Sequence, residues 1–162
     1  MSENMNRLEH LSSLTQKWLI YAEAKNTALI VGNMLALYRI IDSIGSSQNQ
    51  SLIQYVWVAS LTLAVLMAFI SIFPIRDYLE LINRKDSDCT LNPLSSSNLI
   101  KHSPESLLKH LDIPVGPYEK EFAEHVLGTA ALVLRKYLFF KLSCFFTLLS
   151  ILIFAGMKLL NV

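Results

Sequence analysis

The sequence predicts an all-α membrane protein with about three transmembrane helices, two of which continue as long cytoplasmic helices that form a juxtamembrane bundle. Two observations predict this class. The chain is 52% hydrophobic and only 17% charged, and residues 51–75 contain no charged side chain. About 20 apolar residues in a helix span roughly 30 Å, which is the thickness of the hydrocarbon core of a bilayer. A buried helix of a soluble domain rarely needs such a run without a polar face.

Residues 1–26 are expected to form a cytoplasmic amphipathic helix. Apolar side chains recur there at helical spacing along one face: Leu8, Leu11, Trp18 and Ala22. Neither glycine nor proline occurs between Ser2 and Val31, so we expect this helix to continue without a break into a first transmembrane helix.

That first transmembrane helix is predicted at residues 27–44. It contains three polar or charged side chains: Asn33, Arg39 and Asp42. The two charged residues lie toward one end and are three positions apart, so they can pair on one face of the helix. Such a pair can also reach the headgroups. Alternatively, these three side chains line a pore or act in gating, because ionisable groups within a membrane usually face a bundle interior or water.

The second transmembrane helix is predicted at residues 55–73, and it ends at Pro74. The third is predicted at residues 137–157, where Lys141 lies near the start and can extend toward the headgroups. A long helix is expected to open at Pro117 and to continue into the third span. Its apolar stripe consists of Phe122, Val126, Ala130 and Val133.

Residues 74–136 are expected to form a cytoplasmic helical region with a loop at residues 86–102. After this loop, Ser103 has the side chain of an N-cap, and Pro104 suits the first helical position. A short helix over Ser103–Leu111 follows from this pattern.

Basic residues predict the orientation. The N-terminal arm has three Lys or Arg residues and residues 74–136 have eight, whereas residues 45–54 have none and only Lys158 follows the last span. The positive-inside rule therefore places the amino terminus and residues 74–136 in the cytoplasm, and the carboxyl terminus on the other side of the membrane.

Motifs of catalysis are missing from the sequence. It contains no P-loop, no dinucleotide-binding glycine pattern, no HExxH and no paired CxxC. We therefore do not expect an enzyme, a bound metal or cofactor, or a nucleic-acid partner. The histidines of the cytoplasmic region, His102, His110 and His125, are expected to be solvated or to cap helices.

A polar junction before the first span is the main candidate for ligand binding. Helical geometry places Trp18 and Lys25 on one side of the helix, with Asn26 adjacent. An aromatic ring next to a lysine and an asparagine can hold a base and a phosphate, but it can also anchor the helix at the membrane surface. Spacing alone favours the anchor. Arg76 and Lys136 are expected at the same depth, where all of these side chains could form one cationic ring.

The order of elements and motifs resembles a known family. The junction Glu23–Asn26 is followed by an apolar stretch with an early Asn33. A second span then closes on Pro74 and Arg76, and a long helix reaches Arg135–Tyr137 before the last span. Over nearly its whole length the chain resembles the transmembrane effectors of the bacterial Pycsar antiphage systems. It is also similar to two-span effectors of other nucleotide-signalling defence systems.

The resemblance implies an activating ligand, partners and a location. The ligand would be cyclic UMP or cyclic CMP, made by a partner cyclase upon phage infection. Residues 74–136 would belong to the sensing region, and the nucleotide would bind near Trp18, Lys25, Asn26, Arg76 and Lys136. The protein would lie in the bacterial inner membrane, with its carboxyl terminus in the periplasm, and would impair that membrane and cause abortive infection.

Three spans are too few to enclose a sizeable pore, so we expect a homo-oligomer. Two other functions stay open from the sequence. The chain could be a small accessory subunit of a larger membrane complex, or a constitutive lysis or ion-leak protein that needs no nucleotide.

Overall fold

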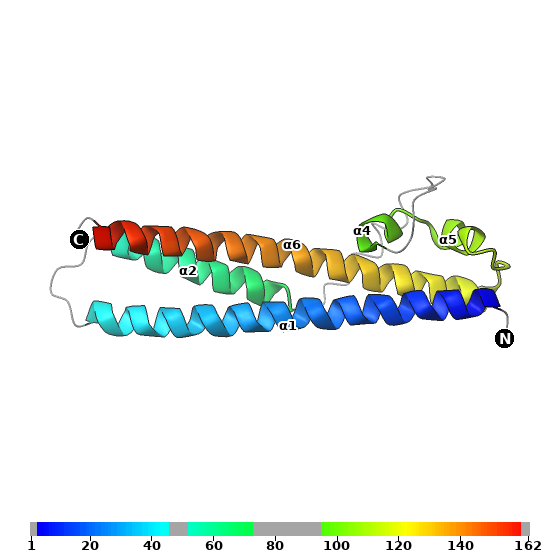
Figure 1. Cartoon of the computed structure of the whole chain (residues 1–162), viewed down its shortest axis with the longest axis horizontal. Coiled ribbons are helices and arrows are strands. Elements are labelled where there is room, and N and C mark those ends of the chain that lie inside the picture. The colour runs from blue at the N-terminus through cyan, green and yellow to red at the C-terminus, as the bar shows by residue number, and fades with distance from the viewer. Residues whose placement is uncertain (1–2, 46–51, 73–94, 160–162) are drawn as a thin grey trace. The chain divides into compact units, whose positions relative to one another are not determined.

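All regular structure in the described part of the chain is helical, which confirms the all-α class. The computed structural model describes residues 3–45, 52–72 and 95–159 (Figure 1). The helices in these ranges are α1 (Glu3–Gly45), α2 (Leu52–Ile70), α4 (Ser96–Leu99), α5 (Pro104–His110) and α6 (Pro117–Leu159).

Two of the helices are unusually long. Helices α1 and α6 each contain 43 residues, which corresponds to about 65 Å at 1.5 Å per residue. The N-terminal arm therefore runs into residues 27–44 as one helix, and the helix that opens at Pro117 continues through residues 137–157. Both predictions of continuity are confirmed.

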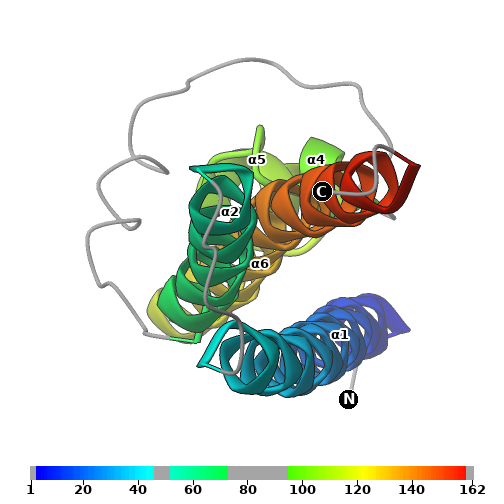
Figure 2. The same cartoon turned by 90° about the vertical axis from the view of Figure 1, so that its left-hand side faces the viewer.

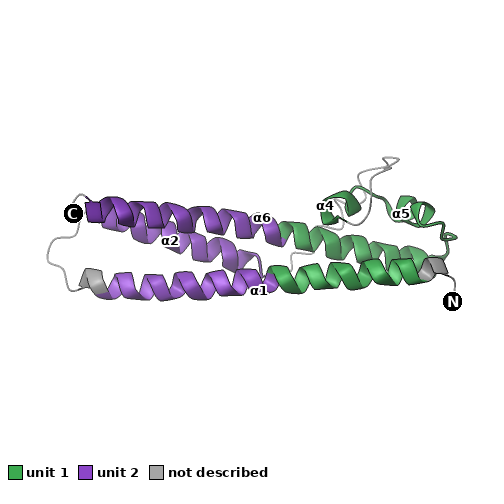
Figure 3. Ribbon diagram, viewed as in Figure 1, with its two compact units in different colours: residues 1–22, 74–135 green, residues 23–73, 136–162 purple. Residues whose placement is uncertain are grey.

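The chain divides into two compact units (Figure 3). Unit 1 comprises residues 1–22 and 74–135, and unit 2 comprises residues 23–73 and 136–162. Helices α1 and α6 contribute residues to both units, whereas α4 and α5 belong to unit 1 and α2 belongs to unit 2.

Unit 1 has an apolar core made by four helices. Leu8 of α1, Leu99 of α4, Leu107 of α5 and Leu127 of α6 are all fully buried within one cluster. The stripe predicted on α6 faces inward, since Val126, Ala130 and Val133 are fully buried and Phe122 packs against the core. The amphipathic pattern of the arm and of the long helix thus produces a packed helical unit.

Helix α5 begins as the sequence predicts. The Ser103 hydroxyl accepts a hydrogen bond from the Ser106 backbone N–H at 3.1 Å, and Pro104 occupies the first helical position. These features satisfy or remove backbone donors that have no partner inside the helix. The helix ends before Asp112, which has a φ of 55°, a left-handed conformation that aspartate adopts more readily than most residues.

The predicted loop at residues 86–102 is wrong at its end, because α4 forms there at Ser96–Leu99. Its Leu99 side chain is fully buried in the core of unit 1, and this burial holds a helix too short to be stable alone. His102 is also buried rather than solvated, although solvation was one of the two roles expected for it. It is 1% exposed, and its Nδ1 lies 3.3 Å from Ser106 Oγ.

In unit 2, α2 and the second parts of α1 and α6 pack side by side (Figure 2). Helices α1 and α6 run in the same direction, because their contacts follow the same order along both helices. Lys136 of α6 bonds to Glu23 of α1, and further toward the carboxyl end of both helices Thr147 bonds to Asn33. Contacts between α2 and α6 run in opposite order. Ser143 of α6 donates to the Ala64 carbonyl at 2.6 Å, and a stack of two aromatic rings, Trp57 on Phe154, lies further along. Helix α2 is therefore antiparallel to the other two, as three successive membrane crossings require.

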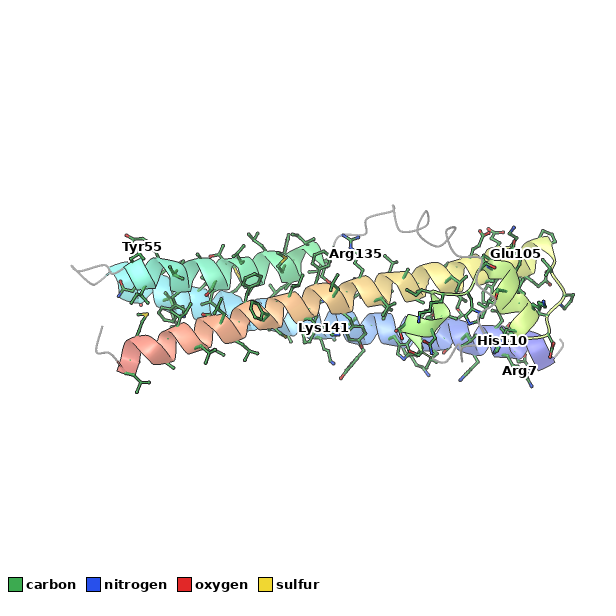
Figure 4. The ribbon with its side chains drawn as sticks, turned by 90° about the horizontal axis from the view of Figure 1, so that it is seen from above. Arg7, Tyr55, Glu105, His110, Arg135 and Lys141 are labelled. Carbon is green, nitrogen blue, oxygen red and sulfur yellow. The ribbon has the colours of Figure 1, made fainter. Side chains whose placement is uncertain are left out.

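Two helices are long and apolar enough to cross a membrane, namely α2 and α6. Only 22% and 11% of their most apolar windows are buried inside the protein. Because most of their apolar surface is uncovered, these helices do not resemble core helices of a soluble protein. Lys141 of α6 is exposed, as expected for a side chain that reaches the headgroups (Figure 4).

Residues 27–44 of α1 do not meet the same criterion within the described part of the chain, so a third crossing stays a prediction. The predicted second span differs slightly from α2, which begins at Leu52 and ends at Ile70. Residue 73, the predicted end, lies outside the described residues.

Candidate functional site

A group of interacting polar side chains lies at one end of unit 2, where α2 ends. It consists of Glu23, Lys25 and Asn26 of α1, Ser71 just after α2, and Lys136 of α6, and we call it the polar cluster. The Lys136 ammonium lies 2.8 Å from the Glu23 carboxylate, and the Asn26 amide donates to the Ser71 hydroxyl at 2.7 Å. Three segments distant in the sequence are thus joined at one level.

The ion pair between Glu23 and Lys136 is unevenly exposed. The Lys136 side chain is 11% exposed and the Glu23 side chain is 50% exposed. Lys136 therefore depends on its partner, because a largely buried ammonium without a counter-ion is costly. The half-exposed carboxylate is open to water, so another anion can compete with it for the ammonium group.

Lys25 lies against aromatic rings beside this pair. Its Nζ is 5.8 Å from the centroid of the Tyr137 ring and 5.7 Å from that of Phe140, distances at which a cation is attracted to the ring face. Lys25 and Lys136 carry two positive charges, whereas Glu23 carries one negative charge. These three groups together favour the approach of an anion.

Asn26 contains an acceptor with no partner. The residue is 1% exposed, and its Oδ1 has no hydrogen-bond partner among the described residues. An unsatisfied buried acceptor costs about 1–3 kcal/mol. A donor from outside the chain, such as water or an N–H or O–H group of a ligand, would remove this cost.

Of the five residues predicted to bind a ligand, three come together in the polar cluster: Lys25, Asn26 and Lys136. Trp18 is half-buried and belongs to unit 1, and Arg76 lies outside the described residues. Their role in binding stays a prediction. Sequence reasoning gave no role to Glu23 or Ser71, although Glu23 lies three residues before Asn26 and therefore on the same face of α1.

The polar residues predicted for a pore or gate separate into two groups. Asn33 is 3% exposed and exchanges hydrogen bonds with Thr147 at 3.0 and 3.2 Å, so it joins α1 to α6. Arg39 and Asp42 are exposed, and no ion pair forms between them. The structure therefore does not show the pairing that their spacing along one helix allows, and a role for these residues in a pore or gate stays a prediction.

Unit 1 carries a shallow groove of about 340 Å³ that the sequence did not predict. Tyr118 and Phe122 stack there with ring centroids 6.3 Å apart. Tyr118 and Phe122 are four residues apart on α6, so the sequence could have predicted that their rings stack. An aromatic pair on an amphipathic helix, however, more often belongs to the core. The lining is Ser12, Gln16, Tyr118, Glu121, Phe122 and His125.

Unit 1 also has an exposed ion pair, in which Lys120 of α6 lies 2.6 Å from Glu105 of α5. Figure 4 labels Glu105 and His110 on α5. The hydrogen bond from Lys120 holds the pKa of Glu105 below its usual value, and the same bond raises the pKa of Lys120. No group of three potential metal ligands occurs among the described residues.

The fold and the polar cluster define a class of protein. The protein is helical, and two of its helices are suited to crossing a membrane. Unit 1 is a packed helical unit, and the polar cluster, which contains two lysines, lies at one end of unit 2.

A comparison with family models identifies the family. Residues 7–161 match the Pycsar effector protein domain, and the chain belongs to this family. It is therefore an effector of antiphage defence that is activated by a cyclic nucleotide made by a partner cyclase. Searches of curated proteins and of solved structures gave no match.

Proposed function

We propose that this protein is an inner-membrane effector that binds cyclic UMP or cyclic CMP during phage infection and then impairs the membrane, which causes abortive infection. The match to the family over residues 7–161 carries this proposal. The uncovered apolar surface of α2 and α6 supports a site of action in the membrane, since lipid is the medium that such a surface requires.

Residues 27–44 of α1 form the third crossing in this proposal. They lie against α6 through the Asn33–Thr147 hydrogen bonds, and α1 and α6 run in the same direction. The distribution of basic residues then places the amino terminus and residues 74–136 in the cytoplasm and the carboxyl terminus in the periplasm.

The nucleotide binds at the polar cluster by ion exchange. Its cyclic phosphate carries one negative charge and replaces the Glu23 carboxylate at Lys136, where a charge-assisted hydrogen bond is already formed. Lys25 adds a second positive charge. The Asn26 Oδ1, which has no partner among the described residues, accepts from an N–H of the base or from the ribose hydroxyl. Trp18 and Arg76 complete the predicted binding set.

Displacement of the Glu23 carboxylate from Lys136 by the phosphate couples nucleotide binding to the membrane helices. The Glu23–Lys136 contact ties α1 to α6, so its loss frees the two helices to move apart within a homo-oligomer. A ligand shifts such an equilibrium by its difference in affinity for the two states, and about 5.5 kcal/mol is enough to take the active state from 1% to 99%.

The test is nucleotide binding to the purified full-length protein in lipid nanodiscs, measured by isothermal titration calorimetry with cyclic UMP, cyclic CMP and, as a purine control, cyclic AMP. Lys25→Ala, Arg76→Ala and Lys136→Ala should each weaken pyrimidine binding. Lys120→Ala is the matched control, because it removes another ion-paired lysine of α6 that lies in unit 1. If the first three variants bind like the parent, the polar cluster is a structural contact and not the binding site.

The groove of unit 1 is the competing location for the nucleotide, because aromatic rings there are available for stacking on a base. Gln16→Ala and Tyr118→Ala belong in the same titration series. Loss of binding in these two variants, with normal binding in Lys25→Ala and Lys136→Ala, would assign the nucleotide to unit 1.

Expression in cells separates the alternative functions. With a pyrimidine cyclase, the effector should dissipate the membrane potential, as read with a voltage-sensitive dye, and without the cyclase it should not. Dissipation without the cyclase would favour a constitutive ion-leak protein. An unchanged potential in both conditions, together with stable association with other membrane proteins, would favour an accessory subunit.

A further inference from the structure

Besides the groove of unit 1, a second cavity lies in unit 2, and no residue of the polar cluster lines it. It is a groove of about 610 Å³ that is open to the outside and largely apolar. All three helices of unit 2 contribute to it. Among its lining residues are Ala28, Gly32 and Ala36 of α1, Trp57 of α2, and Ser150 and Phe154 of α6.

The α1 wall of the groove includes three small residues spaced four apart, at positions 28, 32 and 36, beside larger ones such as Leu29 and Ile40. In membranes such spacing lets another helix approach closely. Gly32 has no reason within the protomer to be glycine, because a Cβ added there would meet nothing within 4 Å. Glycine in a helix costs about 1 kcal/mol relative to alanine. The small wall therefore points to a partner that approaches from outside.

Charges at the carboxyl end of the α1 segment identify the occupant. Arg39 lines the groove and Asp42 lies one turn further along, and both are exposed without pairing to each other. Their heights along the helix differ by about 4.5 Å, which an arginine side chain can span. Two copies with the same orientation in a bilayer would therefore bring Arg39 of one within reach of Asp42 of the other. Ionisable groups within membrane segments are usually paired in this way.

We propose that the groove receives α1 of a second copy of this chain, with an Arg39–Asp42 ion pair between the copies. The small residues Ala28, Gly32 and Ala36 bring the two helices together. This interface rests on the proposed function only in requiring that residues 27–44 of α1 lie in the membrane. It requires no nucleotide.

The first experiment fills the groove. Gly32→Leu adds a side chain that the protomer has room for and that a second copy would meet. Gly156→Leu is the matched control, because a Cβ at Gly156 also meets nothing within 4 Å but this residue does not line the groove. Native mass spectrometry from detergent micelles, without nucleotide, should show oligomers for the parent and for Gly156→Leu. The concentration for half association of Gly32→Leu should rise at least tenfold.

The second experiment reverses the charges. Arg39→Asp alone and Asp42→Arg alone should each weaken association, because each places like charges opposite one another. The double variant restores opposite charges and should recover the parental association. Recovery cannot be explained by misfolding of the single variants. Equal association of all four proteins, or a double variant weaker than both singles, would overturn the ion pair.

Lipid in the groove is the outcome that would overturn the interface as a whole. In that case the same mass spectra would show a phospholipid bound to the monomer of the parent and of Gly156→Leu, absent from Gly32→Leu, with association unchanged. Titration of cyclic UMP and cyclic CMP into the same proteins keeps the two proposals apart. Oligomers that bind neither nucleotide would support the interface and overturn the proposed ligand. Monomers that bind one of the nucleotides would support the proposed ligand and overturn the interface.

Discussion

Replacement of Glu23 by glutamine should make the protein bind its nucleotide more tightly. In the proposed exchange, the Glu23 carboxylate competes with the cyclic phosphate for the Lys136 ammonium, to which it is bonded at 2.8 Å. Glutamine keeps the length and shape of the side chain but removes the competing charge. A variant that loses a charged group from the candidate site would thus gain affinity, which a purely structural role for Glu23 does not predict.

The structure sets the size of this effect. A hydrogen bond to a charged group contributes about 1.5–3 kcal/mol, but the Glu23 side chain is 50% exposed and solvent screens it. We therefore take about 1 kcal/mol for the contact that the ligand must break. Because 1.4 kcal/mol corresponds to a factor of ten in Kd, the Kd for the nucleotide should fall about fivefold in Glu23→Gln. Lys136→Gln should act in the opposite direction, with a Kd about ten- to a hundredfold higher.

Isothermal titration calorimetry of the protein in nanodiscs measures both changes. Glu105→Gln is the matched control, because it disrupts the corresponding carboxylate–lysine pair in unit 1, and it should leave the Kd unchanged. Unchanged or weaker binding by Glu23→Gln would refute the exchange mechanism. So would equal losses of affinity in Glu23→Gln and Lys136→Gln, since that pattern would mean that both side chains only hold the helices together.

Three further predictions concern stability. Ser103→Ala removes the cap of α5 and should destabilise unit 1 by about 0.5–2 kcal/mol in urea unfolding followed by circular dichroism; no change would mean that the cap is dispensable. A double-mutant cycle of Asn33→Leu and Thr147→Val, measured by unfolding in mixed micelles, should give a coupling energy of about 0.6 kcal/mol and at most about 1.7 kcal/mol, whereas additive effects would contradict the hydrogen bond. The pKa of Glu105 is lowered chiefly by the hydrogen bond from Lys120, so the pair stabilises the folded state fully above pH 4.5 and loses this effect as the pH falls through the lowered pKa. The difference in Tm between the parent and Glu105→Gln should therefore shrink on acidification below pH 4.5, and a constant difference would contradict the pairing.

The long helices could be predicted because their signals are local. A run without glycine or proline over residues 2–31 predicted that the N-terminal arm and the start of the first span form one helix, and a proline at a first helical position with an apolar stripe behind it predicted α6. Helix α4 could not be predicted in this way. It has four residues and depends on the burial of Leu99 against segments distant in the sequence. His102 was misjudged for the same reason, since its burial follows from how α4 and α5 pack.

That Lys25, Asn26 and Lys136 lie at one level could be predicted from the sequence, but the side-chain pairs that they form could not. Their depth relative to the membrane stays a prediction. The Glu23–Lys136 pair joins residues 113 positions apart, and only the packing of α1 on α6 reveals it. Arg39 and Asp42 form no ion pair in the structure, although their spacing along one helix allows one.

The distribution of polar contacts in unit 2 indicates where a soluble ligand can act. Lipid is as apolar as the helix surfaces, so hydrophobic burial does not hold transmembrane helices together, and hydrogen bonds between helices contribute instead. Two neutral contacts of this kind, from Thr147 to Asn33 and from Ser143 to the Ala64 carbonyl, involve residues of the predicted spans. The charged contact between Glu23 and Lys136 lies outside those spans, where α1 and α6 enter the membrane in the proposed topology. An anion from the cytoplasm can reach that contact without crossing hydrocarbon, and breaking it removes a charged contact that ties α1 to α6. In the proposed mechanism, a nucleotide signal therefore has most effect at the Glu23–Lys136 pair.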